Sequence, residues 1–424
     1  MANKTETNIK SERSFIVDFG CCLPFGHNLQ SVKLFQQREA ARGREALAIV
    51  CRQAKSYASF QLKDFFFTLP TLYAEILWDA EQSRIKRIWR RFSGIFALLI
   101  GGRLLRNWRA SRAVRRMFKQ HRIAGDDLLI LPSAEYYGTK ALLKRLRRVK
   151  PQQRPRVHLR LIGVLEAAKH SFYKNRLLEL VTLLNASPEK ITVSAEVPRY
   201  ARYLNSILIS HTVIAEPFPL EAIGANIETT GDGAEARNNH ARGATPFTVV
   251  LPGVNRIDKG YFELFNLCKE IFFRFPDIRI VIQDMKTWDP DYKAKYQRKL
   301  GRLVNVELTP AILSREQIME MYRRADLILL HYHPASYFYR GSAIHYEAIA
   351  RGIPVLARKG SGFVEEIENW ESGWAYETKP ELFARLEEAM SYQPEQLRAK
   401  MAAASAKFEQ EVKKADEATL YYLS

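Results

Sequence analysis

The sequence predicts an α/β protein with two doubly wound domains, and three observations lead to this prediction. The chain has 424 residues, of which 47% are hydrophobic, so it is long enough for two domains that each bury a core. Near its start, an apolar run, a glycine-bearing loop, a helical pattern and a second apolar run follow one another, as at the opening of a doubly wound domain. Near its end, residues 342–373 have a helix–strand–helix pattern.

The first domain is expected to cover residues 1–219. Its opening unit consists of a strand at Ser14–Phe19, a helix from Asn28 to Arg42 and a strand at Ala46–Cys51. The remaining elements are short apolar runs and one helix: strands at 128–131, 156–162, 191–194 and 212–214, and a helix at 198–208. Residues 220–246 are polar and rich in glycine, which is typical of a linker.

The second domain is expected to cover residues 247–400, with a helix at 401–424 that packs back toward the first domain. Its predicted strands are 247–251, 278–283, 305–308, 325–331 and 355–357. In its helix–strand–helix unit, Ser342 is a residue type that caps a helix start, and Gly352 is one that ends a helix. Helix N-termini carry free N–H groups and partial positive charge, so this unit suits the phosphates of a nucleotide.

Positive charge is concentrated in the first half of the chain. The formal net charge is +19, and residues 1–220 contain 38 of the 65 Lys and Arg but only 17 of the 46 Asp and Glu. This half is therefore expected to meet something acidic, either a membrane surface or a polyanion. The four cysteines match neither a disulfide framework nor a zinc site, and the polar first 13 residues hold no signal-peptide core. Both features indicate a reducing cytoplasm.

Residues 84–122 form a basic helical insertion with thirteen Lys or Arg and no acidic residue. Aromatic residues and Met117 are interleaved with the cations, and residues 92–102 are an uncharged run of eleven. Because a spanning helix needs about 20 apolar residues, this run is too short to cross a bilayer. The pattern favours a helix in the membrane interface. The alternatives are a solvated basic face over a core-packed helix, or a nucleic-acid site, although no nucleic-acid motif accompanies the charge.

The motif E-A-I-A-R-G-I-P-V-L-A, which begins at Glu347, is followed by G-S-G-F-V-E-E-I and E-S-G-W. These residues resemble the donor-nucleotide half of the GT-B glycosyltransferases, most closely the retaining family 4, also called group 1. The likeness covers residues 248–377 and, less fully, the opening strand–loop–helix. It implies the GT-B fold, in which two Rossmann-like doubly wound domains face each other across a cleft.

The resemblance implies roles for the donor-site residues. In the family, the glutamate matched by Glu347 binds the nucleotide ribose. An arginine and a lysine, matched in type by Arg256 and Lys259 at a shorter spacing, hold the donor diphosphate. Such cations offset the charge that develops as the glycosidic bond breaks. Family members commonly carry another glutamate near the sugar, where this chain has Tyr339; we therefore assign Tyr339, together with the two cations, to catalysis.

Glycines and helix starts complete the expected site. Gly341, Ser342, Gly360 and Gly362 lie at the two helix N-termini and are expected to contact the donor. On the first domain, Gly26, His27 and Asn28 follow the first strand, and His158 and Arg160 lie along a later one; these five are expected to face the acceptor. Asp289 and Asp291 are interpreted as a helix cap, and His331 and His333 lack a third metal ligand nearby. We predict no metal and no cofactor beyond the donor substrate.

The predicted function is transfer of a sugar, expected to be a hexose, from a nucleoside diphosphate sugar to a glycan or lipid-linked acceptor, with retention at the anomeric carbon. The expected setting is cell-surface polysaccharide synthesis, with the enzyme peripherally associated with the cytoplasmic, inner face of the membrane. Two alternatives stay open: a basic protein that binds nucleic acid or another polyanion, and a GT-B-shaped protein without transferase activity, suggested by Tyr339.

Overall fold

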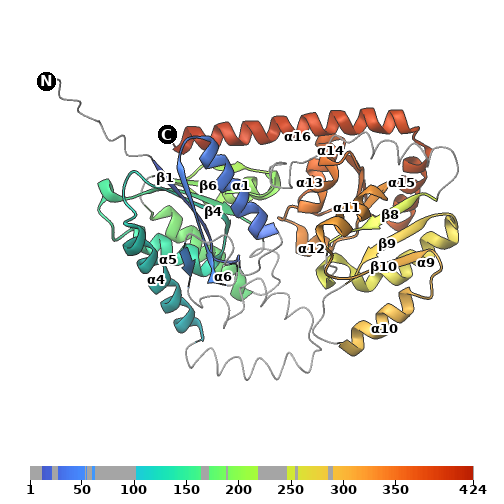
Figure 1. Cartoon of the computed structure of the whole chain (residues 1–424), viewed down its shortest axis with the longest axis horizontal. Helices are drawn as coiled ribbons and strands as arrows, with labels where there is room; N and C mark the ends of the chain where they lie inside the picture. The colour runs from blue at the N-terminus through green and yellow to red at the C-terminus, as the bar shows by residue number, and fades with distance from the viewer. Residues whose placement is uncertain are drawn as a thin grey trace.

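The structure is a computed structural model that describes residues 12–21, 27–52, 54, 60–62, 102–163, 171–187, 190–217, 246–253, 256–284 and 290–423. These residues form two sheets whose strands all pair in parallel. Figure 1 shows the two sheets side by side, each with its own helices. The predicted fold class, two doubly wound α/β domains, is confirmed.

The first sheet has the strand order β3-β2-β1-β4-β5-β6-β7. Its strands are β1 (Arg13–Asp18), β2 (Glu45–Cys51), β3 (Phe60–Leu62), β4 (Leu128–Ala134), β5 (Arg156–Leu161), β6 (Ile191–Ala195) and β7 (Val213–Ala215). Its helices are α1 (His27–Ala41), α4 (Gly102–His121), α5 (Tyr136–Leu146), the short η2 (Pro151–Gln153), α6 (Ser171–Asn185) and α7 (Pro198–Ile207).

The second sheet repeats the same winding, with the order β10-β9-β8-β11-β12-β13. Its strands are β8 (Thr248–Leu251), β9 (Arg279–Gln283), β10 (Val306–Thr309), β11 (Leu327–Leu330), β12 (Val355–Arg358) and β13 (Gly373–Tyr376). Its helices are η4 (Ile257–Lys259), η5 (Tyr261–Glu263), α9 (Leu264–Arg274), α10 (Pro290–Leu300), α11 (Arg315–Arg323), α12 (Pro334–Tyr337), α13 (Ala343–Ala350), α14 (Val364–Trp370), α15 (Lys379–Ser391) and α16 (Pro394–Leu423).

Both faces of each sheet are buried, which explains why the strands read as continuous apolar runs. In β1, Phe15 belongs to the cluster that includes residues of α4 and α5, whereas Ile16 belongs to the cluster that includes residues of α1. In the second sheet, Val249 packs with α9 and α15, and Val250 belongs to the cluster that includes residues of α11, α13 and α14. The alternation follows from the period of two along a strand.

In each sheet the winding reverses between two central strands, β1 and β4 in the first and β8 and β11 in the second. Loops leave the carboxyl ends of such neighbours in opposite directions and open a crevice for ligands. We call these two places the first and second switch points. Most expected donor residues follow strands of the second one.

The last helix joins the two domains. Helix α16 begins at Pro394, seven residues before the predicted start at 401, and runs along both domains (Figure 1). Its Phe408 stacks on Tyr346 of α13 with ring centroids 5.4 Å apart. Farther along, Asp416 forms ion pairs of 2.9 Å with Arg38 and 2.5 Å with Arg42 of α1.

The basic insertion is described only from Gly102 onward, where it forms α4. Met117 and Phe118 are buried against the core rather than presented to a membrane. Trp108 is 51% exposed, and the Arg112 guanidinium lies 5.3 Å from the centre of its ring. Residues 84–101, with all of the uncharged run except Gly102, lie outside the described residues. None of the helices described here combines the length and apolarity needed to cross a bilayer.

Candidate functional site

The second switch point brings together a cluster of cationic side chains. Arg256 and Lys259 follow β8, and Arg340 lies in the loop between β11 and α13. Arg256 donates from Nε and Nη2 to the two carboxylate oxygens of Asp258, at 2.9 and 3.1 Å. Arg340 donates from Nη1 to Asp258 Oδ2 at 3.3 Å. One carboxylate therefore holds two guanidinium groups in place, and the cluster keeps excess positive charge.

A glycine makes room for the lysine of this cluster. Gly253 has φ +81°, and a Cβ atom added there would lie 2.9 Å from Lys259 Nζ and 2.4 Å from Ile344 Cδ1. The Gly253 amide donates to Gln283 Oε1 at 2.6 Å, which fixes the turn after β8. The buried Lys259 amine thus approaches the backbone at the carboxyl edge of the sheet.

Burial and neighbouring charge shift the pKa values of this cluster. Burial, followed by the proximity of Arg256, lowers the pKa of Lys259 to about 7, although Asp258 and Glu347 oppose the shift. Burial alone would raise the pKa of Asp258, but the two arginines outweigh it and lower that pKa to about 2. An added anion would restore the charge on Lys259, so the cluster is suited to bind a diphosphate.

Glu347 lies in α13, close enough to Lys259 to affect its pKa. Its Oε2 accepts a 2.5 Å hydrogen bond from the Tyr322 hydroxyl. Arg351 lies 4.6 Å from the centre of the Tyr322 ring and donates to the Glu347 carbonyl at 2.8 Å. Glu347 Oε1 has no hydrogen-bond partner among the described residues. The carboxylate is therefore oriented by one oxygen and offers the other to a ligand.

Ser342 occupies the N-cap position of α13, but its side chain makes no capping hydrogen bond. Instead it lies close enough to the buried Tyr332 phenol to oppose the rise that burial causes in the pKa of Tyr332. The Lys259 amine lies 5.3 Å from the centre of the Tyr332 ring. Ser342 thus lies beside the cation cluster, as expected for a donor residue, although its predicted capping role was wrong.

Tyr339 faces the first domain. Its ring stacks on Tyr203 of α7 at 4.8 Å and lies 5.5 Å from Tyr200. A Cβ atom added at Gly163 would lie 2.0 Å from the Tyr339 carbonyl oxygen, so glycine is needed where β5 ends. Nearby, the Gly341 amide donates to Glu196 Oε2 at 3.0 Å.

Gly360 and Gly362, which lie between β12 and α14, contact the segment between β11 and α13. Gly360 has φ +88°, and an added Cβ would lie 2.9 Å from Pro334 Cβ. The Gly362 amide donates to the Tyr337 carbonyl at 2.7 Å. Both glycines are therefore adjacent to the donor-site loop, where their contacts brace it.

The first switch point carries acidic groups. Asp18, at the end of β1, is fully buried and accepts from the Gly20 amide at 2.7 Å and from Asn28 Nδ2 at 3.3 Å. Glu135 follows β4 and accepts from the Gly138 amide at 3.1 Å. Burial raises the pKa of each carboxyl to about 7. Of the expected acceptor residues, Asn28 lies here, whereas Gly26 and the side chain of His27 lie outside the described part of the chain.

The structure places His158 and Arg160 inside the first domain. His158 Nε2 lies 2.9 Å from Ser194 Oγ and 3.1 Å from Glu216 Oε2. Arg160 donates from Nη2 to the Glu216 carbonyl at 3.2 Å. Both residues are buried, so their side chains lie in the interior of the first domain and present no surface to an acceptor.

His331 and His333, which have a metal-like spacing, pair with a glutamate instead. His331 Nε2 lies 2.8 Å from Glu263 Oε2, and Arg358 donates to the same oxygen at 3.1 Å. Among the described residues, no group of His, Cys, Asp and Glu is arranged to hold a metal ion. Asp291 lies in the first turn of α10, whereas Asp289 lies outside the described residues.

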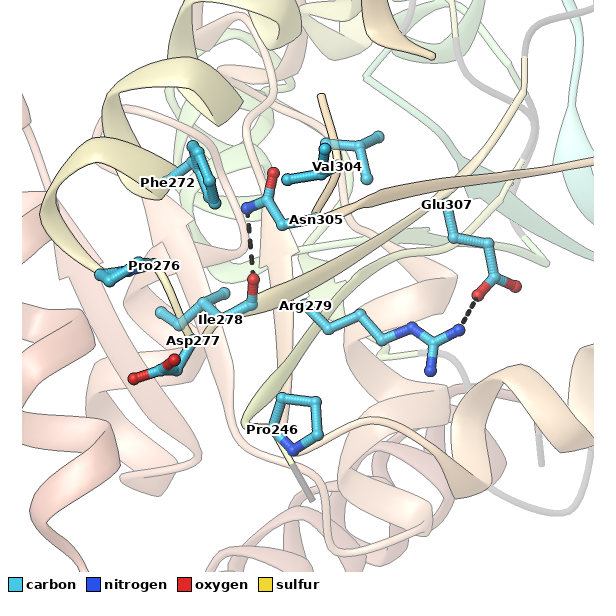
Figure 2. Close-up of a pocket in the computed structure, with 10 residues that line it drawn as sticks. Pro246, Phe272, Pro276, Asp277, Ile278, Arg279, Val304, Asn305 and Glu307 are labelled. Carbon is cyan, nitrogen blue, oxygen red and sulfur yellow. Dashed lines mark hydrogen bonds and ion pairs between the residues drawn. The ribbon is translucent and has the colours of Figure 1, made fainter. Parts of the chain in front are cut away.

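A surface pocket of about 880 Å³ lies at the opposite edge of the second sheet. Figure 2 shows it lined by Pro246, Phe272, Arg279, Asn305 and Glu307 among others. Arg279 and Val306 begin β9 and β10, so this pocket lies at the amino ends of the strands. The cation cluster lies at the carboxyl ends, and the pocket is not part of the candidate site.

Sequence reasoning missed several residues of the site. Asp258 stands between the two predicted cations in the sequence, so its spacing was a usable signal. Arg340 and Tyr322 reach the site from separate loops and helices, and Glu196 comes from the other domain. No local pattern marks residues that meet only through folding.

Comparisons with known proteins agree with this architecture. Residues 232–408 match the family described as glycosyl transferases group 1. The Anabaena protein HepE, solved with UDP, is 15% identical over 96% of this chain and 100% of its own, with a TM-score of 0.61. Sucrose-phosphate synthase from Thermosynechococcus elongatus is 14% identical over 97% and 98%, with a TM-score of 0.63.

A UDP-forming trehalose-phosphate synthase from Burkholderia xenovorans is 11% identical over 97% of this chain and 98% of its own, with a TM-score of 0.62. A search of curated protein sequences gave no significant match. The three solved structures share the two-domain fold with this chain.

Proposed function

We propose, from the premise that this chain is a group 1 glycosyltransferase of the GT-B fold, that it transfers a hexose from a nucleoside diphosphate sugar to a glycan or lipid-linked acceptor. The donor binds at the second switch point, and the acceptor binds on the side of the first domain. The observation that carries this proposal is the cation cluster beside Glu347, because its charge and position suit a diphosphate joined to a ribose.

The reaction breaks the bond between the anomeric carbon and a diphosphate oxygen. The acceptor hydroxyl oxygen bonds to the anomeric carbon, and its proton passes to the leaving diphosphate. Negative charge develops on the leaving diphosphate, where Arg256 and Lys259 stabilise it. Asp258 keeps Arg256 in position through two hydrogen bonds. Glu347 accepts a hydrogen bond from the ribose and thereby sets the distance between the nucleoside and the cations. Retention of configuration follows from the resemblance to family 4 and belongs to this proposal.

The solved relatives support the choice of donor class. HepE was solved with UDP-glucose, and the Burkholderia enzyme is UDP-forming. We therefore take a uridine diphosphate hexose as the first donor to test. Neither relative is near enough in sequence to carry its acceptor over to this chain.

The basic face of the first domain supports an acceptor that lies at an anionic membrane surface. Arg112, Arg115, Arg116 and Lys119 of α4 are exposed, together with Trp108. Clustered cations bind anionic headgroups with about 1 kcal/mol each when they lie near the surface. We propose peripheral association with the inner, cytoplasmic face of the membrane and a role in polysaccharide synthesis.

A thermal-shift screen tests the donor. The purified chain is heated with UDP, GDP or ADP and with a hexose conjugate of each. At 100 times its dissociation constant a ligand stabilises a protein by ~2.7 kcal/mol, so one nucleotide series should raise the melting temperature clearly. If no nucleotide does, the chain is a GT-B-shaped protein without this activity.

Liposome flotation tests the membrane. The chain should float with anionic vesicles at low salt, and the double variant Trp108→Ser, Arg112→Ser should float less. A variant at an exposed cation of the second domain, Lys379→Ser, serves as the control. If the double variant floats like the parent while the chain binds nucleic acid tightly, the polyanion alternative is correct.

A further inference from the structure

A carboxylate of the first domain reaches the loop that precedes α13. Glu196 directly follows β6, at the carboxyl edge of the first sheet. Its Oε2 accepts a 3.0 Å hydrogen bond from the Gly341 amide. Its Oε1 has no hydrogen-bond partner among the residues that the structure describes. One oxygen is thus anchored to the second domain, and the other is left for a ligand.

This contact depends on glycine at position 341. A Cβ atom added there would lie 2.7 Å from Glu196 Cγ and 2.9 Å from its carboxyl carbon. Real Cβ atoms essentially never approach a neighbour so closely. The close approach of Glu196 therefore requires a residue without a side chain at position 341.

Gly341 lies between the two parts of the donor site. Arg340, just before it, binds the Asp258 carboxylate that also holds Arg256. Ser342, just after it, begins the helix that carries Glu347. In a nucleoside diphosphate sugar the diphosphate separates the nucleoside from the sugar. With the ribose at Glu347 and the phosphates at the cations, the sugar extends toward the first domain, from which Glu196 approaches.

Tyr339 cannot supply a carboxylate at this place, and its ring is already stacked on Tyr203. An ionised carboxylate only accepts hydrogen bonds, and a sugar presents hydroxyl donors to it. We propose that Glu196 orients the donor sugar: its Oε2 is held by the Gly341 amide and its Oε1 accepts a hydrogen bond from a sugar hydroxyl. This inference rests on the proposed function and names a specificity residue of the same site from the opposite domain.

Binding titrations of the wild-type chain, Glu196→Ala and Glu196→Gln test this role. The probes are the nucleoside diphosphate and its hexose conjugate that stabilise the wild-type chain in the screen described above. Glu196→Ala should weaken binding of the conjugate about tenfold, since a charge-assisted hydrogen bond is lost. Binding of the diphosphate alone should stay within about twofold. Glu196→Gln, which preserves shape, should fall between the two.

Arg202→Gln is the matched control. Arg202 pairs with Glu365 of α14 at 2.6 Å and so also links the domains, but its side chain is 64% exposed, and among the described residues it forms no hydrogen bond or ion pair with the loop before α13. Its affinities for both probes should equal those of the wild type. If Glu196→Ala binds both probes like the wild type, or loses both equally, the sugar contact is absent. If no probe stabilises the wild-type chain, the proposed function fails first, and this inference fails with it.

Discussion

The two switch points have the same topology but opposite charge. At the second one, Lys259, Arg256 and Arg340 gather around Asp258. At the first one, Asp18 and Glu135 lie near each other without an ion pair among the described residues. Burial moves the pKa of Lys259 down to about 7 and those of the two acids up to about 7.

The difference in charge indicates that two domains of the same topology bind different substrates. The cation cluster becomes fully charged when an anion arrives, so it suits a diphosphate. The acidic edge favours protonated carboxyls and neutral groups, which suits an acceptor hydroxyl better than a phosphate. Much of the excess positive charge of the first half lies on helices such as α4, whose Arg112, Arg115, Arg116 and Lys119 are exposed. Overall charge therefore did not reveal which domain binds the anionic part of the donor.

The largest expected effect concerns the cations of the second switch point, and the contrast between the two switch points would be wrong if turnover did not need them. Lys259→Met should lower turnover of the donor by roughly 100-fold to 1000-fold, because removing one preorganised donor from a transition-state site has that effect. Binding of the bare nucleoside should be unchanged. Kinetics and calorimetry measure the two quantities, and Lys379→Met, at an exposed lysine, is the control. Normal turnover in Lys259→Met would show that the diphosphate binds elsewhere.

The low pKa of Lys259 can be tested without changing the ligand. Because the free amine titrates at about 7 and the bound one must be charged, binding takes up a proton above that pH. Affinity for UDP should therefore fall as pH rises from 7 to 9, by up to about tenfold per pH unit. Lys259→Arg stays charged and should lose this decline. An identical pH profile in both proteins would contradict the assignment.

Variants of Glu347 and Arg256 should distinguish binding of the nucleoside from binding of the phosphates. Glu347→Ala should weaken uridine and UDP alike, by about tenfold each, because the ribose is common to both and a hydrogen bond to a charged group is lost. Tyr322→Phe removes only the group that orients Glu347, so its effect should be smaller and in the same direction. Arg256→Ala, in contrast, should spare uridine and weaken UDP. Isothermal titration measures all three, and a loss confined to UDP in Glu347→Ala would move the ribose site.

The smallest expected effect is that of the buried acid Asp18 on the pH dependence of the free energy of unfolding. The pKa of Asp18 is about 7 in the folded chain against 3.8 for the ordinary group, so the folded state binds more protons between these values. Its contribution to stability falls as pH rises from 4 to 7 and is constant above. Asp18→Asn should thus gain stability relative to the parent at pH 8 compared with pH 5, as urea unfolding measures. A stability difference independent of pH would mean that Asp18 is ionised throughout.

The sequence alone was enough to predict the central strands of each domain. Apolar runs such as 46–51 and 355–357 lie within β2 and β12, because strands buried on both faces must be apolar along their whole length. Edge strands gave weaker signals: β3 and β13 were missed. The strand β13 is only Gly373–Tyr376, and the pairing that makes it a strand is with the distant β12.

What the sequence determined by itself is therefore local: the periodicity that forms strands and helices, the winding that follows from their order, and the motif around Glu347. Only the tertiary structure decided which polar groups meet. His158 and Arg160 alternate with apolar residues as cleft residues could, yet they are buried and contact Ser194 of β6 and Glu216, just after β7, in the interior. Glu196 and Gly341 are 145 positions apart and meet because two sheet edges face each other. Contact between distant residues depends on three-dimensional packing, which no local pattern records.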